Sequence, residues 1–328
     1  VHLVFEPPRN LSLTFTASVK RDDFIVPMEN LELGRVAASG SSGKVRKGLF
    51  SGNKVAIKEV YETYEGCLKT FNEEASVMAK LQHPAVARFF GAASEVNTES
   101  NTKSYYLITE WCDGGTVYDA IHSGIPSFET KLRWSWNICE ALWYFHNRRE
   151  PIAHFDVKPQ NIMLTSKNYN SDAEIRICDL GEARVLKSAY GNRIKLEEEV
   201  GTIPYFPPEM MDLYVANPRK SKHVDFHELD ATKVDTFCAG LVIMFIFTGL
   251  QPYETFRGSV QGILEYALGG GRPGHYDFDS VPSNIAAIVN DMVHFNPDKR
   301  PKMLDAARAF KRLVVNTSGA VPSIYTTA

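Results

Sequence analysis

The sequence predicts an α+β fold of two lobes, in which a small β-rich lobe precedes a larger helical one. A chain of 328 residues exceeds what one hydrophobic core usually fills, so two packed lobes are expected. Short β-branched segments dominate residues 31–110, whereas apolar residues recur every three or four positions beyond residue 115. The change falls at Asp113-Gly114-Gly115, where two glycines permit a bend, and we expect a cleft there.

The small lobe, residues 31–110, is predicted to hold a sheet and one helix. Strands are expected over Val55–Val60 and Tyr105–Ile108, and a helix around Thr70–Lys80, because the apolar period changes between these segments. The polar stretch Ser94–Ser104 favours an exposed hairpin loop.

Residues 111–115 are predicted to be the hinge and residues 116–314 the helical lobe, followed by a tail over 315–328. A surface insertion is expected over Asn217–Asp230. Four helices are predicted from the spacing of apolar residues, over Glu129–Phe145, Val234–Phe247, Ile285–Val293 and Met303–Leu313.

No membrane-spanning segment is expected. The longest uncharged run is Thr236–Tyr253, and its strongly apolar part, Leu241–Phe247, is shorter than the ~20 residues that cross a bilayer. We therefore predict a buried core helix.

Residues 1–30 are predicted to be an N-terminal extension of unknown role, in which Leu11–Phe15 alternates as an edge strand does. The first residue is Val1 rather than Met, and Val1–Phe5 lacks the basic start of a signal peptide. We therefore expect a fragment of a longer protein.

The composition excludes several classes of protein. Apolar residues at 44% and charged residues at 23% are typical of a folded globular chain. A net charge of -3 gives no indication of a nucleic-acid partner. Scattered cysteines without zinc spacing favour free thiols in a reducing, cytoplasmic compartment. These cysteines are Cys67, Cys112, Cys139, Cys178 and Cys238.

A glycine-rich segment, Ala38–Val45, is a candidate phosphate cradle, because backbone amides that approach phosphate need small side chains and a free φ. Ala38 replaces the first glycine of G-x-G-x-x-G, so a plain strand-turn-strand is the alternative. The strand that follows places Ala56 and Lys58 on one face, toward the cleft. Lys58 is then placed to reach phosphates.

A buried lysine needs a carboxylate partner to keep its charge. The predicted helix offers two neighbouring candidates, Glu73 and Glu74. Glu74 lies beside the apolar stripe of Phe71, Ala75 and Met78 and is preferred, while Glu73 is the solvated alternative.

The strongest signal is Ile152–Leu164, which spells I-A-H-F-D-V-K-P-Q-N-I-M-L. It resembles the catalytic loop of eukaryotic protein kinases, H-R-D-L-K-P-x-N, with Phe155 in place of the arginine. The resemblance implies that Asp156 accepts the hydroxyl proton, Lys158 steadies the γ-phosphate and Asn161 holds Mg²⁺.

Further motifs follow in the order of that family. The run D-L-G from Asp179 resembles the D-F-G metal site and implies that Asp179 binds Mg²⁺. Gly201–Glu209 resembles G-T-x-x-Y-x-x-P-E, which implies a pair between Glu209 and Arg300. Asp235 matches the aspartate that orients the catalytic loop.

The resemblance covers most of the chain, residues 31–314, and implies the bilobal protein-kinase fold. The family spacing before His83-Pro84 selects Glu74 as the helix glutamate, and Thr109–Tyr118 resembles the hinge of Raf and other tyrosine-kinase-like kinases. An ATP site is thereby implied on the glycine-rich segment, the following strand, the hinge and a C-lobe floor. Its members are Ala37, Ala38, Ser39, Gly40, Ser41, Ser42, Gly43, Val45, Ala56, Lys58, Thr109, Glu110, Cys112 and Met163.

The resemblance implies a serine/threonine kinase that uses ATP and Mg²⁺ on protein substrates. Lys158 differs from the residue usual in tyrosine kinases, and the family's equivalent of Thr202 bonds both the catalytic aspartate and the lysine. A pseudokinase that binds nucleotide or partners is the alternative, motivated by substitutions in the motifs. These are Ala38, Ser42, Phe155 and Leu180. A small-molecule phosphotransferase is a remote option, because such enzymes generally lack the segment Gly201–Glu209.

Phe155 bears on regulation, because most kinases place there an arginine whose charge is neutralised by a phosphate on the activation loop. The loop Leu186–Val200 holds Ser188, Tyr190 and the acidic run Glu197–Glu199, which is either a solvated charge run or a substitute for phosphate. We predict activity without loop phosphorylation; its loss on phosphatase treatment of the pure protein would contradict this.

Two further residues near the motifs have expected roles. Cys178 is either a reactive thiol near the nucleotide or a small core residue, and the core role is expected. His154 is expected to pack against Leu180, Phe89 and Met78 in the apolar column that active kinases assemble.

Overall fold

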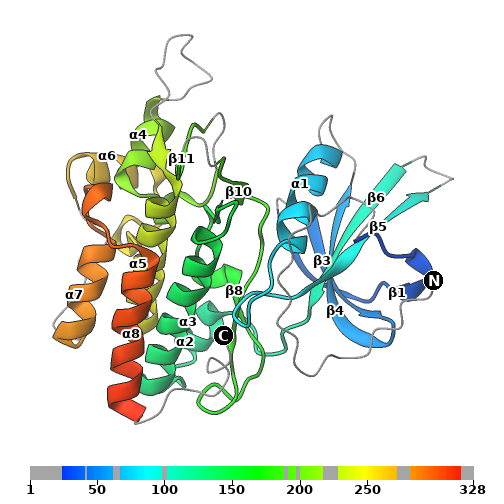
Figure 1. The fold of residues 1–328 in the computed structure, drawn as a ribbon, viewed down its shortest axis with the longest axis horizontal. Coiled ribbons are helices and arrows are strands. Elements are labelled where there is room, and N and C mark those ends of the chain that lie inside the picture. Colours follow the sequence, from blue (N-terminus) through cyan, green and yellow to red (C-terminus); the bar gives the residue numbers. More distant parts are fainter. Residues whose placement is uncertain are drawn as a thin grey trace.

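The computed structural model describes residues 24–40, 43–61, 67–97, 102–187, 191–196, 200–216, 228–271 and 281–318. These residues form a small sheet lobe with one helix and a larger helical lobe, which lie side by side in Figure 1. The predicted α+β bilobal fold is confirmed. The strand proposed for residues 11–15 and the tail beyond residue 318 lie outside the described residues.

The small lobe is built on an antiparallel sheet in the order β1-β3-β4-β6-β5, with β2 also paired to β3. Along β4 the side chains of Val55 and Ile57 are completely buried, whereas the alternating Ala56 and Lys58 are partly exposed. The strands are β1 (Leu31–Glu32), β2 (Val36–Gly40), β3 (Gly43–Phe50), β4 (Asn53–Tyr61), β5 (Phe89–Asn97) and β6 (Thr102–Glu110).

The helix of this lobe, α1 (Cys67–Ala79), lies beside the sheet in Figure 1. Phe71, Ala75 and Met78 recur at helical spacing and are buried. The predicted helix is therefore confirmed. The segment 24–30 also packs on this lobe, which thus begins before the expected boundary at residue 31.

A hairpin is present over Ser94–Ser104, as predicted, but its loop is shorter than expected. Strands β5 and β6 continue to pair through this stretch, as far as the partners Asn97 and Thr102, and only residues 98–101 lie between them. Ladder hydrogen bonds are made by the backbone, so the polar side chains of an exposed hairpin end do not reveal that its strands continue.

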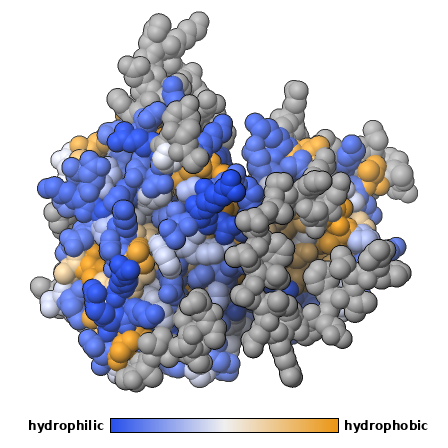
Figure 2. All heavy atoms as spheres, viewed as in Figure 1, coloured by the Kyte–Doolittle hydropathy of each residue, from blue (hydrophilic) through white to orange (hydrophobic). Residues whose placement is uncertain are grey.

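The large lobe contains the four predicted helices and three shorter ones. They are α2 (Val117–His122), α3 (Phe128–His146), α4 (Pro208–Ala216), α5 (Ala231–Thr248), α6 (Val260–Leu268), α7 (Ser283–Met292) and α8 (Met303–Ser318). Its visible face in Figure 2 is largely hydrophilic, with small hydrophobic groups between the polar residues.

Helix α5 is the core of this lobe. Asp230 caps its start by accepting a hydrogen bond from the Thr232 amide, and Gly249 ends it in the left-handed conformation at φ 74°. By length and composition it is the one helix of the described ranges that could cross a membrane, but 83% of it is buried inside the lobe. The prediction of a buried core helix is confirmed.

Three short antiparallel strand pairs are present in the described part of the large lobe. They are β7 (Ile152–Ala153) with β10 (Arg184–Val185), β8 (Ile162–Leu164) with β9 (Ile175–Ile177), and β11 (Arg193–Ile194) with β12 (Leu229–Asp230). The last pair corrects the predicted insertion over Asn217–Asp230, because its end forms a strand with Leu229 buried. Residues 217–227 lie outside the described part. The 3₁₀ turns are Met28–Asn30, Pro159–Asn161, Ile203–Tyr205, Glu254–Phe256 and Pro297–Lys299.

Candidate active site

Lys58 of β4, Glu74 of α1 and Asp179 of the helical lobe meet where the two lobes are in contact. The Lys58 Nζ atom donates to Glu74 Oε1 at 2.8 Å and to Asp179 Oδ1 at 3.0 Å. The Lys58 and Glu74 side chains are only 14% and 5% exposed, so this pair is shielded from water. Glu73 is exposed and pairs loosely with Lys69 at 3.9 Å, so the choice of Glu74 as the partner is borne out by the geometry.

The charges in this cluster maintain one another. Burial alone would lower the pKa of Lys58, but the two carboxylates outweigh burial and raise it. Burial raises the pKa of Glu74, and Lys58 opposes that effect. Burial also acts to raise the pKa of Asp179, but Lys58 and its hydrogen bond lower it. Asp179 is therefore an anion at neutral pH beside a charged lysine.

The catalytic-loop residues form a second cluster around Asp156, which is 7% exposed. Thr202 Oγ1 donates to Asp156 Oδ1 at 2.6 Å, and Lys158 Nζ donates to Asp156 Oδ2 at 2.7 Å and to Thr202 Oγ1 at 2.8 Å. The Asn161 amide donates to the Asp156 carboxylate at 2.8 Å and to its carbonyl at 2.9 Å. The expected bonds of Thr202 to both residues are present.

Asp235, completely buried in α5, holds the loop that carries Asp156. Its carboxylate accepts from the His154 amide at 2.8 Å and from the Phe155 amide at 2.9 Å, as the resemblance implied. It also contacts His146 Nε2 at 2.8 Å. His146 ends α3 and had no signal of its own in the sequence, because this contact joins two helices far apart in the chain.

Both functional loops contain non-glycine residues with a positive φ. Phe155 has φ 63° and Asp179 has φ 58°, a conformation that L-residues rarely adopt and that surrounding bonds must maintain. The hydrogen bond that the Phe155 amide donates to the Asp235 carboxylate is one such restraint, and the hydrogen bond that Lys58 donates to Asp179 is another. These loops are fixed in shape by contacts from distant elements.

The predicted adenine site is bounded by residues from both lobes. Val45 of β3 and Ala56 of β4 are partly exposed on adjacent strands, and Met163 of β8 is partly exposed below the hinge. Gly114 donates to the Leu164 carbonyl at 2.8 Å, which ties the hinge to β8. A Cβ on Gly114 would lie 2.5 Å from that carbonyl oxygen, so the glycine is required.

The hinge residues are held in place by side chains that the sequence did not single out. Glu110 accepts from Arg176 of β9 at 3.0 Å and from the Arg88 amide at 3.3 Å. Thr109 pairs with Ala56 across the sheet, and the Cys112 side chain is buried. The ion pair of Glu110 and Arg176 could not be predicted from the sequence, because the two residues are far apart in the chain and belong to different lobes.

The described parts of the glycine-rich segment belong to strands β2 and β3. Gly40 of β2 pairs with Gly43 of β3, while Ala37, Ala38 and Ser39 are exposed on β2. Ser41 and Ser42, predicted to contact phosphate, lie outside the described residues. Gly43 has φ 129°, and a Cβ there would meet the Glu59 carbonyl oxygen at 2.3 Å. The paired strands agree with the strand-turn-strand alternative, and the role of the segment as a phosphate cradle stays a prediction.

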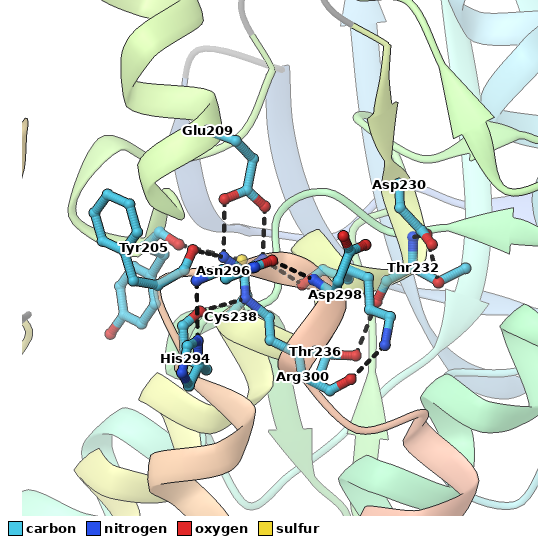
Figure 3. Close-up of polar contacts among 12 residues, drawn as sticks. Tyr205, Glu209, Asp230, Thr232, Thr236, Cys238, His294, Asn296, Asp298 and Arg300 are labelled. Atoms are coloured by element: carbon cyan, nitrogen blue, oxygen red, sulfur yellow. Dashed lines mark hydrogen bonds and ion pairs between the residues drawn. The ribbon is translucent and has the colours of Figure 1, made fainter.

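The end of the activation segment is anchored by a buried ion pair, shown in Figure 3. Arg300 donates to Glu209 in a bidentate arrangement, at 2.6 and 2.8 Å, and its side chain is fully buried. Arg300 also donates to the carbonyls of His294, Lys233 and Phe295. The pair predicted from the resemblance is present. The loop residues Ser188, Tyr190 and Glu197–Glu199 lie outside the described residues.

The expected packing of His154 against Leu180, Phe89 and Met78 stays a prediction, because all three apolar residues share one extended buried region. Met78 and Leu180 belong to one buried cluster, and Phe89 packs against it. His154 is completely buried, and its ring is stacked on Phe145 at 6.3 Å. Phe155 is 1% exposed. An uncharged aromatic ring is thus buried at the position where the family's catalytic-loop motif has an arginine.

Cys178 is partly exposed and does not belong to the buried core, so the expected core role is not confirmed, but its thiol is not activated either. Its Sγ atom lies 3.2 Å from the Asn161 carbonyl, and burial raises its pKa far above the neutral range. A thiol in this state is protonated and a poor nucleophile.

Asp179 and Asn161 form a donor set that suits Mg²⁺. The Asn161 NH₂ group donates its hydrogen bonds to Asp156, so the amide oxygen of Asn161 is the atom that could bind a metal ion. Asp179 supplies a carboxylate oxygen. Clusters of three or more His, Cys, Asp or Glu are absent from the described ranges. Mg²⁺ usually binds through one or two protein carboxylates together with substrate phosphates and water.

Comparison with known proteins places these features in one family. Residues 31–310 match the family model described as "Protein kinase domain". Over 92% of its length the chain is 28% identical to a probable serine/threonine-protein kinase of Dictyostelium discoideum, covering 45% of that protein. It is 27% identical over 87% of its length to a mitogen-activated protein kinase kinase kinase 7-like protein of Drosophila melanogaster, covering 66%.

A third relative is serine/threonine-protein kinase STY46 of Arabidopsis thaliana, 27% identical over 85% of this chain and 44% of that protein. The chain thus spans about half the length of the curated relatives it matches. These relatives confirm the resemblance to eukaryotic serine/threonine kinases of the tyrosine-kinase-like group. The chain belongs to the protein kinase domain family.

Proposed function

We propose that the protein is an active serine/threonine kinase that transfers the γ-phosphate of ATP to hydroxyl groups of protein substrates. One observation carries the proposal: Asp156, Lys158 and Thr202 are joined by three hydrogen bonds of 2.6 to 2.8 Å in the cleft. A carboxylate positioned by a lysine and a hydroxyl is what a phosphoryl transfer to an alcohol requires.

Each charged group then has a task. Asp156 accepts the proton of the substrate hydroxyl, and Lys158 neutralises charge on the transferred phosphoryl group. Lys58, oriented by Glu74, contacts the α- and β-phosphates. Asn161 and Asp179 would hold Mg²⁺, which would neutralise negative charge on the phosphates of ATP. Burial strengthens these interactions, because the attraction between opposite charges is weaker in water, where the dielectric constant is high.

The geometry of Thr202 favours serine and threonine over tyrosine acceptors. Its hydroxyl donates to Asp156 at 2.6 Å, so the segment 201–205 lies close against the catalytic aspartate. A short acceptor side chain must approach Asp156 closely, and this segment supports a substrate backbone at that depth. A phenol on a longer side chain would need more space there.

A pseudokinase is the competing function, and the presence of every charged group speaks against it. Ala38, Phe155 and Leu180 depart from the family pattern, but none of them removes a charge used in the transfer. The hydrogen bond from Lys58 to Asp179 joins the lysine proposed to bind the nucleotide to the aspartate proposed to bind the metal.

We also propose a cytoplasmic location, supported by the free cysteines of the described ranges, which are Cys112, Cys139, Cys178 and Cys238.

The experiment is a kinase assay with the purified protein, Mg-ATP and a generic protein acceptor, next to Asp156→Asn. The variant keeps the shape of the side chain but loses the proton acceptor, so kcat should fall by about 10² to 10⁴-fold. Phosphoamino-acid analysis should give phosphoserine or phosphothreonine. Phosphotyrosine alone would overturn the acceptor class, and wild-type activity no higher than that of the variant would favour the pseudokinase.

A further inference from the structure

The segment 24–30, named here the edge strap, lies along the free edge of the small-lobe sheet. Strand β5 ends the strand order and would otherwise expose its backbone. Ala92 of β5 donates to the Phe24 carbonyl at 2.8 Å and accepts from the Val26 amide at 2.8 Å. The edge strap is therefore bonded to β5 through the backbone, as a parallel bridge at Ile25.

The edge strap reaches both faces of the sheet. Phe24 is 8% exposed and belongs to the buried cluster that also contains Phe71 and Met78 of α1. Val26 and Met28 pack instead against the separate cluster on the other face. The strap thus crosses the sheet edge, and Phe24 is its one side chain on the α1 side.

Phe24 makes its defined ring contact with Phe89 of β5. The ring centroids lie 5.9 Å apart in an edge-to-face arrangement, a geometry that aromatic pairs prefer. Phe89 itself packs against the large buried cluster that also contains Met78. Strand β5, which carries Phe89, is in contact with α1, so Phe24 lies on a residue of the strand that supports that helix.

Strand β5 is shaped to receive the edge strap. Gly91 has φ 152°, and the pairing with β6 shifts between Phe89 and Gly91. A Cβ on Gly91 would lie 2.6 Å from Val26 Cγ1 and 2.8 Å from the Phe24 carbonyl oxygen. Only glycine permits this approach, so the strap contact depends on a residue outside the strap as well.

We propose that Phe24 is a positioning residue that holds α1 where Glu74 reaches Lys58. Met78 and Glu74 stand one helical turn apart on α1, so packing that fixes Met78 also fixes Glu74. The edge strap adds a buried aromatic ring to that packing from outside the sheet. The inference rests on the proposed kinase activity, because its consequence for the reaction is the bond of 2.8 Å between Lys58 and Glu74.

The test compares three variants in the whole chain. Phe24→Ala removes the ring, Gly91→Ala obstructs the strap from the side of β5, and Ile25→Ala is the matched control, since Ile25 is 48% exposed in the same segment. Two readouts are used: kcat and KM for ATP, and amide hydrogen exchange of α1 compared with α5. The exchange measurement does not depend on kinase activity, so failure of the proposed function and failure of the strap are told apart.

We expect kcat to fall about fivefold or more in Phe24→Ala and Gly91→Ala, the range of a typical coupling between sites, and not in Ile25→Ala. Exchange of α1 should rise in the same two variants while that of α5 stays protected. Phe24→Leu restores an apolar side chain and should recover part of both readouts. If Phe24→Ala fails to fold, Phe24→Leu and Gly91→Ala decide the matter.

Unchanged α1 exchange in those two variants overturns the inference, whether or not the wild type is active. Equal loss of α1 and α5 protection in the variants that fold would also overturn it, because the strap would then stabilise the fold without positioning α1. An inactive wild type with faster α1 exchange would contradict the proposed function and leave the positioning role of Phe24 supported.

Discussion

Lys58 keeps its charge in a buried place because Glu74 and Asp179 lie within hydrogen-bond distance of it. Glu74→Gln removes one of these charges and leaves the lysine held by Asp179 alone. A charge-assisted hydrogen bond contributes about 1.5 to 3 kcal/mol, so kcat/KM should fall about 10- to 100-fold in a steady-state assay.

The neighbouring Glu73 provides the control for this prediction. Its side chain is 63% exposed and its contact with Lys69 is 3.9 Å long. Glu73→Gln should therefore keep kcat/KM within about twofold of the wild type, since exposed pairs contribute little. Equal losses in the two variants would show that Glu74 has no specific role.

His83 makes the stability of the protein depend on pH. Burial, with a smaller effect of the charge on Arg176, lowers the pKa of His83 to about 4, and its Nδ1 atom accepts from the Ala85 amide. The unfolded chain binds a proton near pH 6.5 and the folded chain does not, so stability is lost as the pH falls from 7 toward 4.

His83→Asn should remove this dependence. Between pH 7 and pH 5 the wild type should lose about 1 to 2 kcal/mol more free energy of unfolding than the variant, measured by urea denaturation at both values. Identical losses in the two proteins would mean that His83 is protonated in the folded state.

At the scale of elements, the core of the large lobe depends on a close approach between α5 and the end of α7. A Cβ on Gly240 of α5 would lie 2.9 Å from the Met292 Cβ and 2.7 Å from Val293 Cγ1. Alanine is normally the better helix former by about 1 kcal/mol, but overpacking of a core costs about 1 to 3 kcal/mol. Gly240→Ala should therefore destabilise the protein.

Thermal unfolding measures this effect, with Gly262→Ala of α6 as the comparison. The nearest atoms to a Cβ there are side-chain atoms at 3.0 and 3.2 Å, which can move away. We expect a smaller change of Tm, of either sign, at Gly262. A rise of Tm in Gly240→Ala would show that the two helices can separate without cost.

The same scale shows where sequence patterns failed. Helices α1, α3, α5, α7 and α8 were predicted, because apolar stripes such as Phe71, Ala75 and Met78 repeat with the period of the helix, whereas the short helices α2, α4 and α6 were not. The outer ends of β5 and β6 were not, because their pairing is made by the backbone and leaves no trace in polar side chains. The strand at Leu229–Asp230 was missed for the same reason.

At the scale of the whole molecule, Arg300 joins the activation segment to the helical lobe. It is fully buried, and it binds Glu209 as well as backbone carbonyls from two other segments. Removing one partner of a buried ion pair costs about 3 to 5 kcal/mol, because the other charge is left without compensation. Arg300→Met should lower the free energy of unfolding by about that amount in chemical denaturation.

The surface pair of Lys54 and Asp113 is the control for Arg300. Its atoms are 3.7 Å apart and its side chains are 63% and 54% exposed. Lys54→Met should change the free energy of unfolding by less than about 1 kcal/mol. If Arg300→Met were equally mild, the activation segment would be anchored by its apolar contacts instead.

The sequence by itself determined the chemical groups and their local order. Asp156, Lys158 and Asn161 stand at fixed short offsets, and over so few residues the backbone leaves little freedom in where their side chains go. The partners of these groups, including Glu74, Thr202 and Arg300, followed from the resemblance to the family.

Only the tertiary structure decided how the distant segments meet. The contact of Asp235 with His146, the pair of Glu110 with Arg176, and the edge strap on β5 each join residues that no periodicity connects. The physical reason is that such contacts arise when packing brings two elements together, so neither residue's neighbours in the chain carry a sign of them.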